Sequence, residues 1–206
     1  MRINIIVLIF LLLIANRSLA IFETRLTYGM LASNPDLAAV YTGNTSEVPS
    51  SAPHFGLGVD AIFTLPVIGL GIGARYENLG FKSSTDETTY KVSSTRMALI
   101  LSYRIINTLM FMGPIATYGL THTNNLKWFT TSSGTRVERD FSPNRSSSYS
   151  LGLEAGVKLA SFILGAEIGY EDFKWNNMIN STFTLDTPVD LNMNGTYAKF
   201  LFGFSI

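Results

Sequence analysis

The last twelve residues, Gly195 to Ile206, read GTYAKFLFGFSI, and their side chains alternate in character. Phe200, Phe202 and Phe204 fall in one phase, whereas Lys199 falls in the other. Since successive side chains of a β-strand point to opposite faces, this pattern predicts a strand with one apolar face. An exposed apolar edge promotes aggregation of a soluble protein, whereas the lipid-facing side of a membrane barrel requires such a row. The stretch therefore predicts a transmembrane β-barrel.

The first twenty residues have the composition of a secretory signal peptide. Arg2 gives a basic start, residues 3–15 form an apolar run interrupted by Asn4, and Ser18 and Ala20 occupy the small-residue positions before a cleavage site. The apolar run is shorter than the roughly 20 residues that a membrane-spanning helix needs, which disfavours a retained anchor. We therefore expect residues 1–20 to be the signal peptide and residues 21–206 to be the mature domain.

The composition excludes several classes of protein. The chain carries 15 basic and 15 acidic residues, so loss of Arg2 and Arg17 with the signal leaves a net charge of −2, which argues against a nucleic-acid partner. There are no cysteines, which excludes disulfides, thiol catalysis and thiolate metal sites. Hydrophobic residues make up 47% of the chain, yet no apolar run after Ala20 is long enough for a membrane helix.

Eight segments show alternation over about the length of a tilted membrane strand. They cover residues 22–30, 54–65, 68–78, 94–105, 109–121, 149–159, 162–171 and 195–206. Short turns at 66–67, 106–108 and 160–161 alternate with long polar segments at 31–53, 79–93, 122–148 and 172–194. Short turns on one side and long extracellular loops on the other are typical of outer-membrane barrels, so we expect an eight-stranded antiparallel transmembrane β-barrel.

The fifth segment has the least regular pattern, because Pro114 interrupts it and it carries no charge. We expect Phe111 and Ile115 to point inward. In this phase the outward residues are Met112, Ala116, Tyr118 and Leu120.

Aromatic residues and charges support the assigned phases. Two girdles of outward aromatics are predicted, with Tyr28, Tyr76, Tyr118, Tyr149 and Tyr170 at the loop ends and Phe22, Phe63, Tyr103, Phe162 and Phe204 at the turn ends. All charges of the strands fall inward, and they are Glu23, Asp60, Glu77, Glu154, Glu167, Glu171, Arg25, Arg75, Arg96, Arg104, Lys158 and Lys199. A lipid-facing Arg or Lys costs about 2–4 kcal/mol at mid-membrane, which explains this segregation.

The signal peptide, eight alternating segments, four long loops and aromatic last strand resemble the small outer-membrane barrels of the OmpA/OmpX type. The resemblance covers the whole mature chain and implies that the barrel-assembly machinery reads the last strand. Such chains typically end in Phe, whereas this chain ends in Ile206, with Phe204 two residues earlier. We expect a monomer in the cell outer membrane, in contact with outer-membrane lipids and lipopolysaccharide.

An eight-stranded barrel has an interior just wide enough for side chains to fill it. The inward charges should therefore form a paired network, because unpaired buried charge is costly. The turn at 66–67 predicts Gly58 opposite Arg75, with Asp60 in diagonal reach. The turn at 160–161 predicts Glu154 opposite Glu167, with Arg75 leaning toward both. Paired carboxylates can act in acid–base catalysis, but a plugged lumen admits substrate poorly, so we favour a structural cluster.

Two histidines raise the alternative of a lipid-modifying enzyme, because some small barrels place a His and a Ser near the outer leaflet. His54 and His122 both lie at the loop ends of strands. Their hydroxyl neighbours are Ser50 and Ser51 for His54, and Thr121 and Thr123 for His122. No family motif spans these positions, and no third metal ligand lies at useful spacing. We therefore predict no catalytic, cofactor or metal site and no enzyme activity.

The long loops carry aromatic and charged residues that we expect to be exposed. The aromatics are Trp128, Phe129, Phe173 and Trp175, and the charges of the third loop are Arg136, Glu138, Arg139, Asp140 and Arg145. This composition is typical of binding hot spots, and equally of a hairpin that extends above the membrane or of a surface that anchors to lipopolysaccharide. The sequence favours a non-enzymatic surface-interaction protein with a charge-plugged lumen. The alternatives are a narrow or lateral channel for small or hydrophobic molecules and, third, an outer-leaflet lipid-modifying enzyme.

Overall fold

The computed structural model describes residues 21–40, 52–65, 68–86, 88–132, 135–159, 161–180 and 189–206. The predicted signal peptide, Ser50, Ser51, Pro66 and Val67 lie outside the described residues. The signal peptide and the domain boundary at residue 21 therefore stay predictions. Within the described ranges, no helix is long and apolar enough to cross a membrane.

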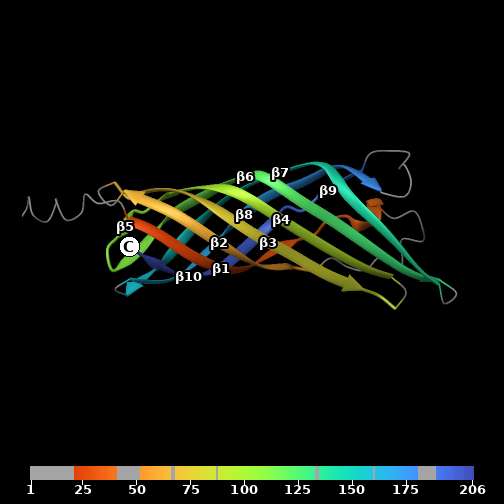
Figure 1. Cartoon of the computed structure of the whole chain (residues 1–206), viewed down its shortest axis with the longest axis horizontal. Helices are drawn as coiled ribbons and strands as arrows, with labels where there is room; N and C mark the ends of the chain where they lie inside the picture. The colour runs from red at the N-terminus through yellow and green to blue at the C-terminus, as the bar shows by residue number, and fades with distance from the viewer. Residues whose placement is uncertain are drawn as a thin grey trace, which may run out of the picture.

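The described chain is built almost entirely of antiparallel strands (Figure 1). Its elements are β1 (Ile21–Ser33), the 3₁₀ helix η1 (Leu37–Val40), β2 (His54–Leu65), β3 (Leu70–Ser84), β4 (Thr88–Tyr103), β5 (Ile106–Asn107), β6 (Met110–Ser132), β7 (Thr135–Leu159), β8 (Phe162–Asn180), β9 (Val189–Asn192) and β10 (Gly195–Ser205). Eight long strands form a ring in the order β10-β1-β2-β3-β4-β6-β7-β8, and the pairing of β8 with β10 closes it. The short β5 and β9 pair with β6 and β8. The predicted eight-stranded antiparallel barrel is confirmed.

The exterior of the ring is an apolar band bounded by aromatic girdles. The predicted girdle residues all point outward, with exposures from 44% for Phe22 to 63% for Tyr118. The irregular fifth segment, residues 109–121, has its predicted phase, since Phe111 and Ile115 are buried and Met112 is exposed. No charged side chain points outward from the described strands within this band. Such an exterior is that of a barrel immersed in lipid.

Three of the four long polar segments are mostly strand, which corrects the prediction of long loops. β3 and β4 pair as far as Ser84 and Thr89, and β6 and β7 as far as Ser132 and Thr135. Figure 1 shows these hairpins at the end of the barrel opposite the C-terminus. We call this end the hairpin end and the other the turn end. The alternation continues above the girdle with its polarity inverted, apolar residues inside and polar ones outside, so the lipid-facing pattern no longer marks it.

The connection between β2 and β3 is longer than the predicted two-residue turn. Leu65 pairs with Leu70, and Gly69, at φ +69°, donates its backbone N–H to the Leu65 carbonyl at 2.8 Å. The register therefore moves by two residues and places Asp60, rather than Gly58, directly opposite Arg75. A shift of two keeps every side chain on its predicted face.

Candidate functional site in the barrel interior

The inward charges form three clusters stacked along the barrel axis. The cluster nearest the turn end centres on Arg104, which donates to both carboxylate oxygens of Glu23 at 2.5 and 2.7 Å and to Glu154 at 3.0 Å. Arg25 donates to the other oxygen of Glu154 at 2.6 Å, and Lys158 lies 3.3 Å from Glu23. The register of the strands brings these groups to one level of the lumen, because they lie on β1, on β7 and directly after β4.

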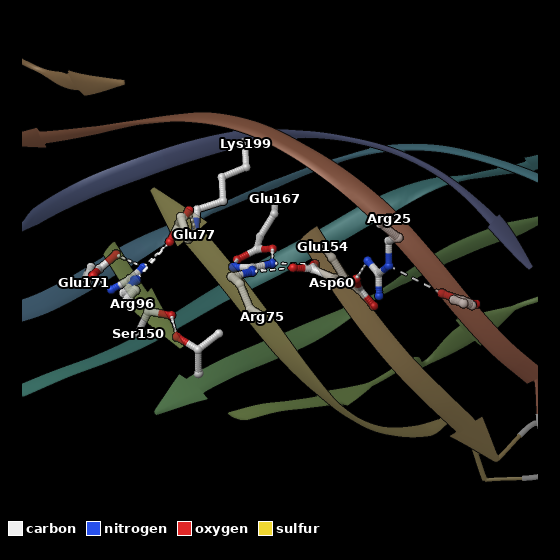
Figure 2. Close-up of polar contacts among 12 residues, drawn as sticks. Arg25, Asp60, Arg75, Glu77, Arg96, Ser150, Glu154, Glu167, Glu171 and Lys199 are labelled. Carbon is white, nitrogen blue, oxygen red and sulfur yellow. Dashed lines mark hydrogen bonds and ion pairs between the residues drawn. The ribbon is translucent and has the colours of Figure 1, made fainter. Parts of the chain in front are cut away.

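The middle cluster consists of Arg75 between two acids. Its guanidinium donates to both oxygens of Asp60 at 2.8 and 2.9 Å, and to both oxygens of Glu167 at 3.1 and 2.7 Å. Figure 2 shows Arg75 between Asp60 and Glu167. Forked arginine–carboxylate pairs of this kind are both strong and geometrically specific. Arg75 thus ties β2 and β3 to β8 across the lumen.

The third cluster lies toward the hairpin end. Arg96 donates to Glu77 at 2.9 and 2.6 Å and to Glu171, with one of these contacts at 2.9 Å. Lys199 on β10 lies 2.6 Å from the other oxygen of Glu77. Figure 2 shows Arg96, Glu77 and Glu171 to one side of Arg75 and Arg25 to the other. Six acids and six bases therefore neutralise one another inside the membrane-spanning part of the lumen, as predicted.

One predicted contact is wrong. Glu154 lies directly opposite Glu167, as expected, but it bonds to Arg25 and Arg104, whereas Arg75 bonds to Asp60 and Glu167. Each carboxylate thus has its own arginine, which removes the repulsion that two facing acids would otherwise suffer. Guanidinium groups therefore engage both carboxylates.

A second, apolar closure of the lumen lies above the charge clusters. Contrary to the prediction, Trp128, Phe173 and Trp175 are buried, and Phe129 is half-buried. The rings of Trp128, Phe173 and Trp175 pack with buried side chains from the extended strands and from η1, namely Leu31, Leu37, Val40, Phe81, Tyr90, Val92, Leu126, Phe141, Met178, Leu191, Met193 and Tyr197. The sequence signal for this core is the inward apolar phase of residues 79–93, 122–148 and 172–194, the segments predicted to be loops.

The histidines lie inside the barrel, on the wall near the aromatic core. His54 is fully buried, with Nε2 3.3 Å from Ser33 Oγ and its ring stacked on Phe81 at 4.6 Å. His122 Nε2 lies 2.9 Å from Ser148 Oγ. Neither imidazole has a carboxylate partner among the described residues, and no cluster of three or more metal-ligating side chains occurs among them. Thr121 and Thr123, which flank His122, are exposed and point away from it.

The backbone pairing ladder between β6 and β7 is interrupted. The two strands pair from Met110–Val157 to Tyr118–Tyr149 and again from Leu126–Phe141 to Ser132–Thr135. In the intervening stretch, side chains bridge the strands in place of the backbone ladder. His122 contacts Ser148, and Asn124 donates to Ser146 at 2.7 Å. The interruption lies just above the girdle tyrosines Tyr118 and Tyr149.

The β6–β7 hairpin carries the charges predicted for the third loop. Lys127 donates to Glu138 at 3.1 Å and to Asp140 at 3.4 Å. The bond to Glu138, followed by that to Asp140, raises the pKa of Lys127, so the side chain stays charged. Arg139 lies over the Trp128 ring, 5.2 Å from its centroid. The aromatic and charged residues of this hairpin therefore support its own fold above the membrane.

A closed ring of eight antiparallel strands with an apolar exterior and a charged interior defines a transmembrane β-barrel of the outer-membrane type. No family model matches the sequence, and no curated protein sequence matches it.

Several solved structures are similar to the chain. The attachment invasion locus protein Ail of Yersinia pestis, solved with the heparin analogue sucrose octasulfate, is 14% identical over 91% of this chain and 99% of that chain, with a TM-score of 0.48. The outer membrane protein OprG of Pseudomonas aeruginosa is 14% identical over 92% and 97%, with a TM-score of 0.47. Neisserial surface protein A is 13% identical over 91% and 96%, with a TM-score of 0.43.

Proposed function

We propose that this protein is a non-enzymatic barrel of the bacterial outer membrane that presents a rigid, folded surface to extracellular partners. The observation that carries the proposal is the double closure of the lumen, by salt bridges within the membrane and by an aromatic core above it. A barrel closed in this way is a scaffold rather than a pore. Its extended strands hold the outward side chains of β3, β4, β6 and β7 in fixed register above the lipid.

The interior chemistry also favours a non-enzymatic role. The Ser148–His122 contact has the distance of a nucleophile–base pair, but among the described residues no carboxylate orients the imidazole. Ser148 is buried and His122 stacks on the buried Phe173, so both groups face the lumen rather than the lipid from which a lipid substrate would arrive. We therefore assign the pair to the wall of the barrel.

The test combines two measurements on refolded wild-type protein. Conductance across a planar bilayer reports passage along the axis, and an assay of lipid A acylation reports lipid-modifying activity. We expect no steady conductance and no change in lipid A acylation. A steady conductance like that of a wide porin would overturn the scaffold in favour of transport, and a change in lipid A acylation would overturn the assignment as a non-enzyme.

The interrupted β6–β7 ladder favours a second candidate, lateral passage of small apolar molecules between the strands. Side-chain bonds bridge this stretch, which lies at the border between lipid and the extracellular barrel. Because the chain has no cysteines, the pair Asn124→Cys and Ser146→Cys gives a clean cross-link. Oxidation should stop uptake of an apolar probe into vesicles, whereas oxidation of the paired positions Thr130→Cys and Val137→Cys should not. Equal uptake by the oxidised and reduced Asn124/Ser146 pair would contradict lateral passage.

A further inference from the structure

Three lysines lie side by side on the outer surface of the extended barrel. Lys82 on β3 pairs directly with Lys91 on β4, and Lys91 pairs directly with Lys127 on β6. Their chain neighbours Phe81 and Tyr90 are buried in the lumen, so the lysines occupy the outward face. Lys82 and Lys91 are exposed, and the Lys127 side chain is 39% exposed. We call these three residues the lysine row.

A row of like charges in directly opposed positions is unfavourable, because the Cβ atoms of such pairs lie roughly 4.5–5.5 Å apart. Lys127 is compensated by Glu138 and Asp140 on β7. Lys82 and Lys91 make no ion pair with any described residue. Two adjacent ammonium groups are thus left facing outward, and an anion seated between them would turn the repulsion into attraction.

The surface below the lysine row changes character in steps. Along β4 the outward residues pass from Leu99 and Met97 through Thr95 and Ser93 to Lys91. Apolar side chains thus give way to hydroxyls and then to a positive charge on one continuous face. This is the profile that a lipid with a polar, anionic head region would match.

The height of the lysine row above the aromatic girdle limits which anions can reach it. Lys82 lies six residues beyond the girdle residue Tyr76 on β3. At about 3.3 Å per residue and a tilt of about 40°, the row stands roughly 15 Å above the girdle. Because an aromatic girdle lies at the level of the lipid head groups, an anion that meets the lysine row must extend about this far beyond them.

We propose that the outward face of β3, β4 and β6 binds the acidic core oligosaccharide of neighbouring lipopolysaccharide, with Lys82 and Lys91 contacting its phosphate and carboxylate groups. The inference rests on the outer-membrane location proposed above and adds a specific partner for one face of the barrel. The continuity of the lysine row with the lipid-facing band favours a membrane-anchored saccharide over a soluble one.

The test compares binding of two probes to refolded protein in detergent, namely lipid A alone and lipopolysaccharide that carries its phosphorylated core. Wild-type protein should prefer the molecule with the core. Lys82→Gln with Lys91→Gln should weaken that binding by roughly tenfold to thirtyfold, with little change for lipid A. Lys174→Gln is the matched control, since Lys174 is exposed near the same end and already paired with Asp172 at 3.2 Å.

A second variant separates binding from folding. Lys91→Glu places an acid between Lys82 and Lys127, so the barrel should fold at least as well as wild type while core binding is lost.

Equal core binding by wild type and the double Gln variant would overturn the inference, as would equal affinity of wild type for both probes. Stronger binding of a soluble sulfated polysaccharide than of the core would also overturn it, in favour of a soluble glycan. Recovery of the wild-type protein outside the outer-membrane fraction would instead overturn the proposed location.

Discussion

Asp60 and Arg75 lie directly opposite each other on β2 and β3, and the Arg75 guanidinium donates hydrogen bonds to both oxygens of the Asp60 carboxylate at 2.8 and 2.9 Å. The same guanidinium holds Glu167 on the far wall. One side chain therefore links three strands through the middle of the lumen, and its loss would leave two buried carboxylates without their cation.

Arg75→Ala should destabilise the barrel by about 3–5 kcal/mol, because breaking one partner of a buried ion pair leaves uncompensated charge. Adding Glu167→Gln should recover part of this lost stability, since it removes one of the two carboxylate charges that Arg75→Ala leaves unpaired. Urea unfolding of the protein in vesicles, followed by the gel shift of the folded barrel, measures both effects.

Glu154→Gln is the informative control for this rescue. Glu154 lies opposite Glu167 but bonds to Arg25 and Arg104. In the Arg75→Ala background it should therefore add to the instability. Rescue by Glu154→Gln equal to that by Glu167→Gln would show that the two clusters share charge rather than acting separately.

Removal of the signal peptide is the second expectation. The Ser18-Leu19-Ala20 site predicts that the mature protein begins at Ile21 and fractionates with the outer membrane. N-terminal sequencing of protein from isolated membranes checks it. A protein that retains Met1, or one found in the cytoplasm, would contradict the prediction.

The phase of the last strand can be tested by charge placement. Phe202 lies between Leu26 and Leu164 in the middle of the apolar band, whereas Phe204 lies at the turn-end girdle. Phe202→Arg should cost about 2–4 kcal/mol and Phe204→Arg less, because the penalty falls toward the interface. The folded fraction in vesicles measures the difference.

The inward residue Lys199 provides the control for this test. Lys199→Gln should insert well, since Glu77 keeps Arg96 as a partner. A defect as large as that of Phe202→Arg would reverse the assigned phase of the strand.

The sequence predicts the membrane-spanning part well for a physical reason. An outward charge is costly inside a bilayer, so each charged residue of the membrane-spanning strands reports the phase of its strand. Above the girdle this rule no longer applies, because water permits polar outward residues. Trp128 and Trp175 then signal an inner core rather than an exposed loop. Register is equally hard to predict, since one longer turn at Gly69 moves Arg75 from Gly58 to Asp60.

The contacts of Glu154 show what alternation cannot supply. The acid directly opposite it, Glu167, follows from the 160–161 turn, but its arginines come from β1 and from beyond the end of β4. Which side chains meet across a lumen depends on how the strands stagger around the closed ring. No local pattern in the sequence carries that information.

The last prediction concerns the two closures of the lumen, which act in series. Arg75→Ala opens only the middle of the charged part, while the core around Trp175 and Phe173 still blocks the hairpin end. Its conductance should therefore stay small. Trp175→Ala alone should also conduct little, because the salt bridges remain. Arg75→Ala combined with Trp175→Ala should give clearly larger conductance than the sum of the single variants in a planar bilayer. An equally large rise in the Arg75→Ala variant alone would show that the aromatic core does not seal the barrel.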